Sequence, residues 1–406
     1  MTKVKLGILR EGKVPPDKRV PLSPQQCKLV ESKFSNVEVI VQPSPIRSYK
    51  DEEYVSEGIK LQEDLSECDI LLGVKEVQID DLIPNKKFMF FSHTIKKQPY
   101  NRKLINAILD QKIQLIDYEV LKDKQNKRLI GFGRYAGIVG CYNAFLTYGL
   151  KTGLYTLKPA NLCRDRKEVE KELKKVILPN DAKIVVTGFG RVGHGAKEIL
   201  DLLPINEVSP EEFLKNQFNS PVFTQLEVED YYGRIDGKPF DKKEFYSNPE
   251  IFKSTFKRYS EVAEIYIPCH YWNSKAPFIL TAEDLKAEKC KLKVVADISC
   301  DIAGPIASTL RPSTIENPIY GYNPITGKED DFMKEDIIAV MAVDNLPCEL
   351  PLDASQDFGN ELLKYILPAI FDTDPDKIIE RGSETDLNGN LMPAFAYLAD
   401  YVAGKE

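Results

Sequence analysis

The chain has 406 residues, of which 43% are hydrophobic, so there is enough apolar material for two or three domains with separate cores. Its 55 basic and 62 acidic residues give a net charge of −7 without a long basic run, which makes nucleic acid and anionic membranes poor candidates for partners. No stretch approaches the roughly 20 apolar residues that cross a bilayer, and the N-terminus lacks the apolar centre of a signal peptide. We therefore expect a cytoplasmic protein that acts on a small molecule.

The cysteines are scattered along the chain and form no C-x-x-C pair. They are Cys27, Cys68, Cys141, Cys163, Cys269, Cys290, Cys300 and Cys348. This spacing argues against a disulfide framework and against a structural zinc site. We expect reduced thiols and no bound metal.

The first 121 or so residues alternate short apolar runs with polar helical patterns. The apolar runs are VKLGILR, VEVIVQ, DILLGVK, KFMFFSH and IQLIDYEVL. Such alternation predicts a parallel sheet with helices on its faces. Ligands gather outside the carboxyl ends of parallel strands, and Lys75, His93 and Glu119 occupy three such ends. We expect these three side chains to converge on one crevice.

Two long helices are predicted to join two lobes. Residues 133–156 are apolar on most sides, and residues 353–371 form an amphipathic pattern that returns the chain to the first lobe. We expect a substrate and catalytic domain formed by residues 1–134 plus 354–406, and a dinucleotide-binding domain formed by residues 135–353. Residues 204–259 show no clear periodicity, and no topology is predicted for them.

The sequence DAKIVVTGFGRVGHGAKEIL predicts a strand, a glycine turn and a helix. Gly188, Gly190 and Gly193 have the G-x-G-x-x-G spacing of a dinucleotide-binding turn. The first glycine permits the tight turn, the second lets the backbone approach a pyrophosphate, and the third lets helix and strand pack closely. The free N–H groups at the start of the helix then face the anion.

An acid–base pair and two carboxylate-binding arginines complete the reasoning from residue types. Desolvation would lower the pKa of Lys75 toward a range suited to a general base, and histidine, the residue type at position 93, is the side chain whose unperturbed pKa lies near neutrality. The guanidinium groups of Arg19 and Arg128 can bind carboxylates in a bidentate geometry. These residues predict a nicotinamide enzyme with an anionic substrate.

Eight motifs occur in a characteristic order: RVPLSP, GVKEV, FFSHT, IDYEVL, FGRYAG, GFGRVGHGA, ADISCD and VDNLP. In this order and spacing they resemble the saccharopine dehydrogenase branch of the alanine dehydrogenase and transhydrogenase superfamily. Four longer segments are most similar to the lysine–2-oxoglutarate reductase half of bifunctional lysine-degrading enzymes: IYIPCHYWNSKAPFILT, ADISCDIAG, VDNLPCELPLDAS and GSETDLNGNLMPAFAYL. The chain ends where that half ends, so a second catalytic half is not expected.

The resemblance implies an α/β fold of two Rossmann-like, doubly wound parallel-sheet domains, joined by long helices with a cleft between them. It also implies a reversible, NAD(P)-dependent interconversion of saccharopine with L-lysine and 2-oxoglutarate through an imine. In that reaction Lys75 is the expected proton acceptor and His93 the expected proton donor. Glu76 and Glu119 are expected to tune the charge state of this pair.

The resemblance further assigns binding residues by position. Those expected to contact the substrate are Arg19, Gln98, Glu119, Arg128, Phe132, Ser299, Cys300 and Asp301. Those expected to face the cofactor are Gly188, Gly190, Arg191, Gly193, Tyr271, Ile298, Val343, Asp344, Asn345 and Leu346.

The choice between NAD and NADP stays open at the sequence level. NAD-binding folds usually place an acidic residue about 20 positions after the first glycine, where it holds the ribose 2′-hydroxyl. Ser209 occupies that position here, with Glu207 two residues earlier. A missing acid together with Arg191 in the turn would tolerate a 2′-phosphate.

Two other functions remain open. An amino-acid dehydrogenase similar to alanine dehydrogenase shares the Arg, Lys and His pattern, although the CHYW and VDNLP segments weigh against it. A non-catalytic dinucleotide-binding sensor would keep the fold, but the presence of Lys75, His93 and Arg19 argues against it. The oligomeric state and the physiological direction of the reaction are not predicted.

Overall fold

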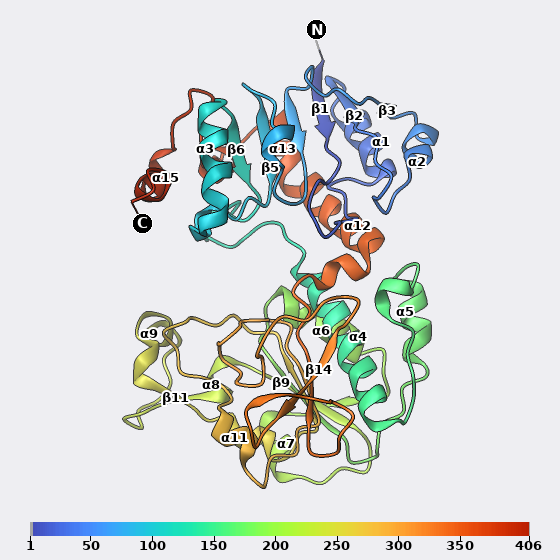
Figure 1. The fold of residues 1–406 in the computed structure, drawn as a ribbon, viewed down its shortest axis with the longest axis vertical. Helices are drawn as coiled ribbons and strands as arrows, with labels where there is room; N and C mark the ends of the chain where they lie inside the picture. The colour runs from blue at the N-terminus through green and yellow to red at the C-terminus, as the bar shows by residue number, and fades with distance from the viewer. Residues whose placement is uncertain (1–2, 406) are drawn as a thin grey trace. The chain divides into compact units, whose positions relative to one another are not determined.

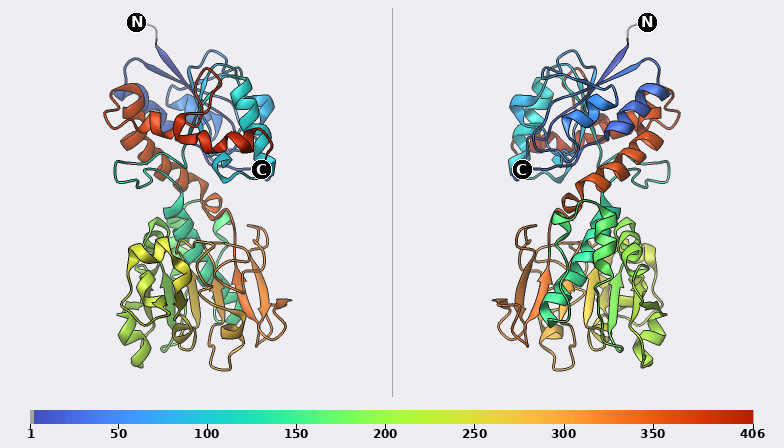
Figure 2. Two further views of the ribbon diagram at one scale, coloured as in Figure 1. Left: turned by 90° about the vertical axis from the view of Figure 1, so that its left-hand side faces the viewer. Right: turned by 90° about the vertical axis from the view of Figure 1, so that its right-hand side faces the viewer.

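The computed structural model describes residues 3–405, which divide into two compact units (Figure 1). Unit 1 combines the described residues up to Phe132 with those from Pro351 onwards, and unit 2 runs from Gly133 to Leu350. The last helices, drawn in orange and red, lie among the blue N-terminal elements of unit 1 (Figure 2). Unit 1 is therefore discontinuous in sequence.

Unit 1 contains a parallel sheet with the strand order β3-β2-β1-β4-β5-β6. Its strands are β1 (Val4–Ile8), β2 (Val37–Val41), β3 (Lys60–Leu61), β4 (Ile70–Leu72), β5 (Lys87–Phe90) and β6 (Gln114–Asp117). This is the order of a doubly wound Rossmann sheet, in which the carboxyl ends of all strands lie at one edge.

Helices cover both faces of this sheet. They are α1 (Pro24–Lys33), α2 (Asp51–Ser56), α3 (Arg102–Asp110), α12 (Pro351–Glu361), α13 (Leu367–Phe371), α14 (Ile378–Gly382) and α15 (Ala399–Val402), with short 3₁₀ segments η1 (Ile79–Asp81), η2 (Thr94–Lys96), η3 (Pro99–Asn101) and η8 (Pro393–Leu398). The π-helical segment η7 (Leu362–Ile366) joins α12 to α13. One core joins α1 to the α12–α13 segment, and a second joins α3 to the C-terminal residues around Tyr401. The C-terminal segment thus completes the first unit.

Unit 2 contains a second sheet with the order β15-β14-β16-β13-β12-β7-β9-β8 and a separate β10-β11 hairpin. The strands are β7 (Lys183–Thr187), β8 (Asn206–Glu207), β9 (Val222–Leu226), β10 (Tyr232–Arg234), β11 (Phe252–Ser254), β12 (Ile265–Pro268), β13 (Val294–Ala296), β14 (Ile319–Asn323), β15 (Lys328–Asp330) and β16 (Ile338–Met341). The six neighbouring strands β16, β13, β12, β7, β9 and β8 pair in parallel, whereas β14 is antiparallel to both β15 and β16. The predicted α/β class with two Rossmann-like parallel sheets is confirmed.

The helices of unit 2 include the long apolar helix expected after Phe132. They are α4 (Gly133–Thr152), α5 (Arg166–Leu173), α6 (Arg191–Leu200), α7 (Pro210–Lys215), α8 (Val228–Tyr231), α9 (Lys242–Ser247), α10 (Lys257–Ser260) and α11 (Ala282–Lys286), with turns η4 (Ala160–Leu162), η5 (Pro249–Ile251) and η6 (Leu346–Glu349). Within residues 3–405, no helix is both long and apolar enough to span a lipid bilayer.

Residues 204–259, for which no topology was predicted, form an aromatic-rich extension of unit 2. They contain β8, α7, β9, α8, the β10-β11 hairpin, α9 and most of α10. Phe245 packs against Tyr232 and Phe252 with ring centroids 4.8 and 5.2 Å apart. Strands β8 and β9 join the main sheet, whereas clustered aromatic side chains hold together the part from α8 onwards, where the sequence shows no regular helical or strand period.

Glycines allow helices α4 and α6 of unit 2 to touch along their backbones (Figure 1). A Cβ atom added at Gly137 would lie 1.9 Å from the carbonyl oxygen of Val192, and one added at Gly195 would lie 2.0 Å from that of Arg134. No side chain fits at either position. The Arg134 guanidinium also binds Glu198 through both of its oxygens, at 2.6 and 2.9 Å.

We predict that Gly137→Ala destabilises unit 2. An isolated helix would gain about 1 kcal/mol from this change, but the backbone overlap should instead cost about 1–3 kcal/mol. Thermal unfolding followed by circular dichroism should show a lower Tm. Gly190→Ala is the control, since its added Cβ has nothing within 4 Å and should shift Tm far less. An unchanged or higher Tm for Gly137→Ala would contradict the close contact.

Candidate active site

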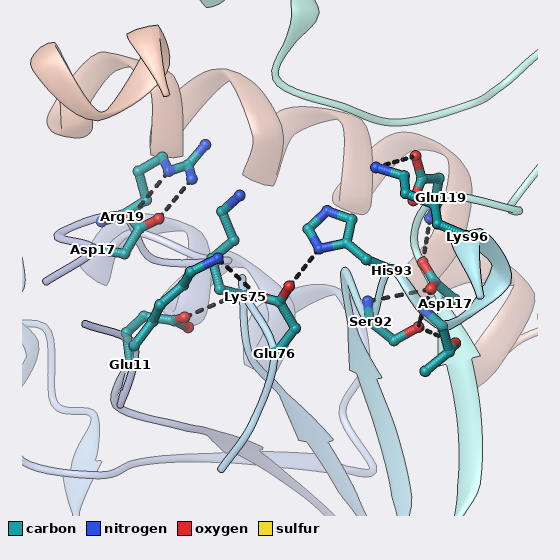
Figure 3. Close-up of polar contacts among 12 residues, drawn as sticks. Glu11, Asp17, Arg19, Lys75, Glu76, Ser92, His93, Lys96, Asp117 and Glu119 are labelled. Carbon is teal, nitrogen blue, oxygen red and sulfur yellow. Dashed lines mark hydrogen bonds and ion pairs between the residues drawn. The ribbon is translucent and has the colours of Figure 1, made fainter. Parts of the chain in front are cut away.

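The proposed acid–base residues of unit 1 follow three neighbouring strands of its sheet. Lys75 comes after β4, His93 after β5 and Glu119 after β6, and these strands pair side by side. Figure 3 shows Lys75, Glu76 and His93 at the ends of adjacent strands, with Arg19 beside Lys75. Parallel strands therefore bring these side chains to one edge of the sheet.

The backbone of Lys75 is fixed by a carboxylate, and its amine is largely desolvated. Glu11 accepts hydrogen bonds from the N–H groups of Val74 and Lys75, at 2.6 and 2.9 Å. Burial is the main cause that lowers the pKa of Lys75, and the positive charges of Arg19 and Lys13 lower it further. This shift favours the neutral amine, the form that can accept a proton.

His93 is oriented by Glu76. Its Nδ1 lies 2.5 Å from Oε1 of Glu76, whose other oxygen is 3.1 Å from Nζ of Lys13. Burial alone would raise the pKa of Glu76, but the hydrogen bond and charge of His93 hold it down at about 2. Because an ionised Glu76 accepts the Nδ1–H, Nε2 is the nitrogen left to exchange a proton.

Arg19 is buried together with a carboxylate. Its Nε and Nη2 bind Asp17 at 3.0 and 2.6 Å, and its guanidinium lies 4.2 Å from the centre of the Phe132 ring. Burial would raise the pKa of Asp17, but the charge and hydrogen bonds of Arg19 hold it well below its usual range. Sequence reasoning missed Asp17, although it stands two residues before Arg19 in DKR.

Among the remaining predicted substrate residues of unit 1, Glu119 and Arg128 lie close together, whereas Gln98 lies near the C-terminal segment. Oε1 of Glu119 is 3.6 Å from Nζ of Lys96 and 3.9 Å from Nη1 of Arg128. The guanidinium of Arg128 lies 5.4 Å from the centre of the Phe91 ring. Gln98 is exposed, and its carbonyl accepts a hydrogen bond from the Tyr401 hydroxyl at 2.5 Å.

The glycine turn of unit 2 has the geometry that a pyrophosphate requires. Gly188 has a φ of +98°, and a Cβ at Gly193 would lie 2.0 Å from the carbonyl oxygen of Gly188. Gly190 is the N-cap residue of α6, and a Cβ there would project into open space. The turn therefore leaves room for a ligand directly at the N-terminus of a ten-residue helix, where N–H groups face outward. These residues fit a dinucleotide.

A cavity of about 590 Å³ opens beside this turn within unit 2. It is lined by the glycine turn, by the aromatic extension and by the residues that follow β12, among them Arg191, Glu227, Tyr231, Lys242, Tyr246 and Tyr271. His270 also lines it and is buried, and burial lowers the pKa of its imidazole to about 3. A cavity of this size and mixed character suits part of a nucleotide.

The acidic residue beside the turn is Glu227, not a residue near position 209. Ser209 caps the start of α7, where its hydroxyl accepts from the N–H of Glu212. The strand paired directly with β7 is β9, and Glu227 follows its last residue, Leu226. The inserted helix α7 displaces the acid along the sequence, so the expectation that Ser209 replaces it is wrong. Lys242 Nζ lies 3.2 Å from the Glu227 carboxylate.

The other predicted residues of unit 2 follow β12, β13 and β16 at the same edge of the sheet. Tyr271 is 83% exposed, whereas Ile298, Val343 and Leu346 are buried. The segment from Val343 to Leu346, including Asp344 and Asn345, leads into the turn η6. The predicted cofactor residues thus lie along one edge of the unit 2 sheet.

The Ser299–Asp301 loop is built around a buried carboxylate that sequence reasoning missed. Asp297 accepts hydrogen bonds from the N–H and hydroxyl of Ser299 and from the N–H of Cys300. Cys300 has a φ of +51°, and burial is the main cause that raises the pKa of Asp301. In the described part of the chain, no group of three or more His, Cys, Asp or Glu side chains could hold a metal ion.

Comparisons with known proteins find relatives of this chain. Residues 7–139 match the family described as alanine dehydrogenase/PNT, N-terminal domain. The chain is 31% identical over 404 residues to alpha-aminoadipic semialdehyde synthase of Arabidopsis thaliana, covering 89% of this chain and 38% of that protein. The mitochondrial synthase of Bos taurus is also 31% identical, with coverages of 90% and 43%. The chain therefore spans about two fifths of the length of these relatives.

A relative of matching length is less similar in sequence. Saccharopine dehydrogenase (NAD(+), L-lysine-forming) of Emericella nidulans is 26% identical over 384 residues, which cover 88% of this chain and 90% of that protein. Among solved structures, L-alanine dehydrogenase has a TM-score of 0.64 at 16% identity, covering 98% of this chain and all of that one. The transhydrogenase of Sinorhizobium meliloti has a TM-score of 0.60 at 16% identity, with coverages of 96% and 100%. These two structures share the fold, and the resemblance of the chain to the saccharopine dehydrogenase branch of the alanine dehydrogenase and transhydrogenase superfamily is confirmed.

Proposed function

We propose that this chain is an NAD(P)-dependent oxidoreductase that interconverts saccharopine with L-lysine and 2-oxoglutarate through an imine. The observation that carries the proposal is the desolvated Lys75 beside the His93–Glu76 pair, on adjacent strand ends of unit 1. The saccharopine dehydrogenases of similar length support the reaction, and the synthases support it for the part of their length that matches.

Lys75 is proposed to accept the proton of the substrate amine. Imine formation requires an unprotonated amine, and the cations Arg19 and Lys13 favour a neutral Lys75 that can take up this proton. Their positive charge also suits a site that must bind dicarboxylates. The buried Glu11 accepts a hydrogen bond from the backbone of Lys75. Burial and the charge of Asp17 raise the pKa of Glu11 to about 7, so Glu11 is only partly ionised at neutral pH.

His93 is proposed to deliver a proton to the departing hydroxyl of the carbinolamine. The Glu76 carboxylate fixes the Nδ1–H tautomer, so the proton moves to and from Nε2. In the direction of saccharopine cleavage the same groups act in reverse, with water attacking the imine carbon. Arg19, Gln98, Arg128 and Phe132 are proposed to bind the dicarboxylate, and Ser299, Cys300 and Asp301 are proposed as further substrate-binding residues.

The nicotinamide cofactor supplies or accepts the hydride when it is bound. Its pyrophosphate is proposed to lie on the glycine turn, with Arg191, Tyr271, Ile298 and the segment 343–346 around the rest of the molecule. Small-molecule substrates require no nucleic-acid or membrane partner. The scattered thiols suit a reducing compartment such as the cytoplasm.

A cofactor-oxidation assay tests the proposal. Purified protein with L-lysine, 2-oxoglutarate and NADH or NADPH should oxidise the cofactor. Pyruvate with ammonia should not replace these substrates. Turnover only with pyruvate and ammonia would assign an alanine dehydrogenase activity instead, and no turnover with either set would leave a dinucleotide-binding protein.

Replacing the acid–base pair should remove most of the activity. We expect Lys75→Met and His93→Gln each to lower kcat by about two to four orders of magnitude. Activity should rise with pH as Lys75 loses its proton, and this limb should disappear from the pH–rate profile of Lys75→Met. Cofactor affinity, measured by fluorescence titration, should stay unchanged. Lys215→Met, at an exposed surface ion pair, is the control. Wild-type turnover in both variants would rule out the mechanism.

Arg19→Lys should weaken substrate binding although the charge is kept. Lysine has no guanidinium group, so it can neither bind Asp17 through two nitrogens nor stack on the Phe132 ring as Arg19 does. We expect KM for 2-oxoglutarate to rise by about tenfold, the equivalent of one lost charged hydrogen bond. Arg47→Lys is a matched control, because Arg47 is also buried, pairs with Asp51 and lies 4.4 Å from the Tyr54 ring centre. Equal KM changes in both variants would remove Arg19 from the site.

Glu227 is expected to disfavour NADPH. Its carboxylate, beside the glycine turn, would repel a 2′-phosphate and accept a hydrogen bond from a 2′-hydroxyl. Glu227→Ala should therefore raise kcat/KM for NADPH relative to NADH by about tenfold or more, as loss of one charge contact implies. Glu229→Ala, an exposed acid of α8, should leave the ratio unchanged. The same ratio in Glu227→Ala would place the ribose elsewhere.

A further inference from the structure

The backbone at His93 is in a conformation that needs external support. His93 has a φ of +56°, in the left-handed region that residues other than glycine seldom adopt. It stands between the end of β5 and the turn η2. Such a conformation persists only where neighbouring groups hold it. The two residues that flank His93 provide this hold.

Ser92 and Thr94 are both fully buried and bound through their side chains. The N–H of Ser92 donates to Oδ2 of Asp117 at 3.2 Å, and the Ser92 hydroxyl donates to the same oxygen (Figure 3). The N–H of Thr94 donates to the Ser92 hydroxyl at 3.1 Å, and its own hydroxyl donates to Glu384 at 2.5 Å. Two carboxyl groups therefore fix the backbone on both sides of His93.

Glu384 reaches this loop from the C-terminal segment. Its N–H donates to the carbonyl of Leu115 at 2.8 Å, and the Thr385 hydroxyl accepts from the N–H of Leu115 at 2.9 Å. Residues 383–385 thus run beside β6, the edge strand of the sheet. The position of Glu384 is set by backbone pairing and not by a flexible tail.

The two carboxyl groups occupy an environment that disfavours two negative charges. Asp117 and Glu384 are fully buried, and both approach the Ser92 hydroxyl. Burial raises the pKa of both groups. The other acid facing Asp117 is Glu119, whose carboxylate faces Lys96 and Arg128. The phenol of Tyr397 also faces the pair, and it contributes no positive charge. Burial and the proximity of the second acid therefore disfavour a state in which both carboxyl groups are ionised.

We propose that Asp117 and Glu384, acting through Ser92 and Thr94, are positioning residues that fix the His93 imidazole against Glu76. Neither carboxyl group touches His93 itself. Each carboxyl group accepts a hydrogen bond from one of the two hydroxyls, Asp117 from Ser92 and Glu384 from Thr94, so the pair holds both residues that flank the imidazole. The effect on catalysis rests on the proposed function, but the effect on the geometry of His93 does not.

Nuclear magnetic resonance of the imidazole groups tests the geometry directly. The chain has three histidines, so ¹⁵N-histidine labelling gives three ring systems, and His93→Gln identifies that of His93. Glu384→Leu should shift or broaden the His93 signals and leave those of His194 and His270 in place. Glu384→Gln, which keeps a neutral group of the same shape, should restore the wild-type His93 signals. Should Glu384→Leu fail to fold, Thr94→Val cuts the same link and should move the same signals.

A neighbouring buried residue provides the control. Ser383 is buried, and its hydroxyl binds Gln114 and the carbonyl of Ile379 without contacting the His93 loop. Ser383→Ala should leave the His93 signals unchanged. Wild-type signals in Glu384→Leu or Thr94→Val, or an equal shift in Ser383→Ala, would overturn the proposal.

Kinetics of the same variants adds the catalytic consequence. We expect Glu384→Leu to lower kcat by about 10- to 100-fold, as small misplacements of catalytic groups do, while the Kd of the cofactor stays within about twofold. Glu384→Gln should recover most of this loss. Because the spectra do not depend on turnover, an inactive wild-type protein would count against the proposed function, whereas unmoved signals would count against the positioning role.

Discussion

At Gly137 and Gly195, the contact between α4 and α6 leaves no room for a side chain between the two backbones, and the packing of unit 2 depends on it. Gly137 and Gly195 each lie against a carbonyl of the other helix. Helix α6 begins at the glycine turn, so this contact fixes the helix whose N-terminus faces the proposed pyrophosphate. Gly193 closes the arrangement, since it packs against the carbonyl of Gly188. In unit 2 close backbone contacts therefore fix the position of the proposed site, whereas in unit 1 charged side chains do so.

Unit 1 gathers opposite charges at the carboxyl edge of its sheet and excludes water from several of them. Arg19 and Asp17 are buried as a pair, and the cation of Arg19 in turn disfavours the charged form of Lys75. Glu76 is the counterpart for His93, and it stays ionised because its partners outweigh its burial. Burial and neighbouring charges therefore favour a neutral Lys75 and an ionised Glu76, and such separation of charge states is what the proposed acid–base pair requires.

The parts of the site that local sequence determines could be predicted, and those that depend on distant segments could not. Gly188, Gly190 and Gly193 form a turn through local spacing alone, and Lys75 and His93 follow apolar runs that must be strands. Glu227 escaped prediction because α7 and β8 lie between α6 and β9, which shifts the acid away from its usual spacing. Glu384 lies 290 residues from Thr94, and no periodicity links them. Pairing across such distances appears only when the sheet is assembled.

The left-handed backbone of His93 depends both on the local sequence and on distant segments of the chain. The sequence KFMFFSHT places a histidine after a strand, but a histidine in ordinary extended backbone would direct its ring along a different path. The conformation exists because Ser92 and Thr94 are each bound to a buried carboxyl group, one from β6 and one from the C-terminal segment. The discontinuous composition of unit 1 thus has a chemical consequence. Residues that follow unit 2 in the chain return to complete the surroundings of a residue that precedes it, so the geometry of His93 forms only once both ends of the chain have folded together.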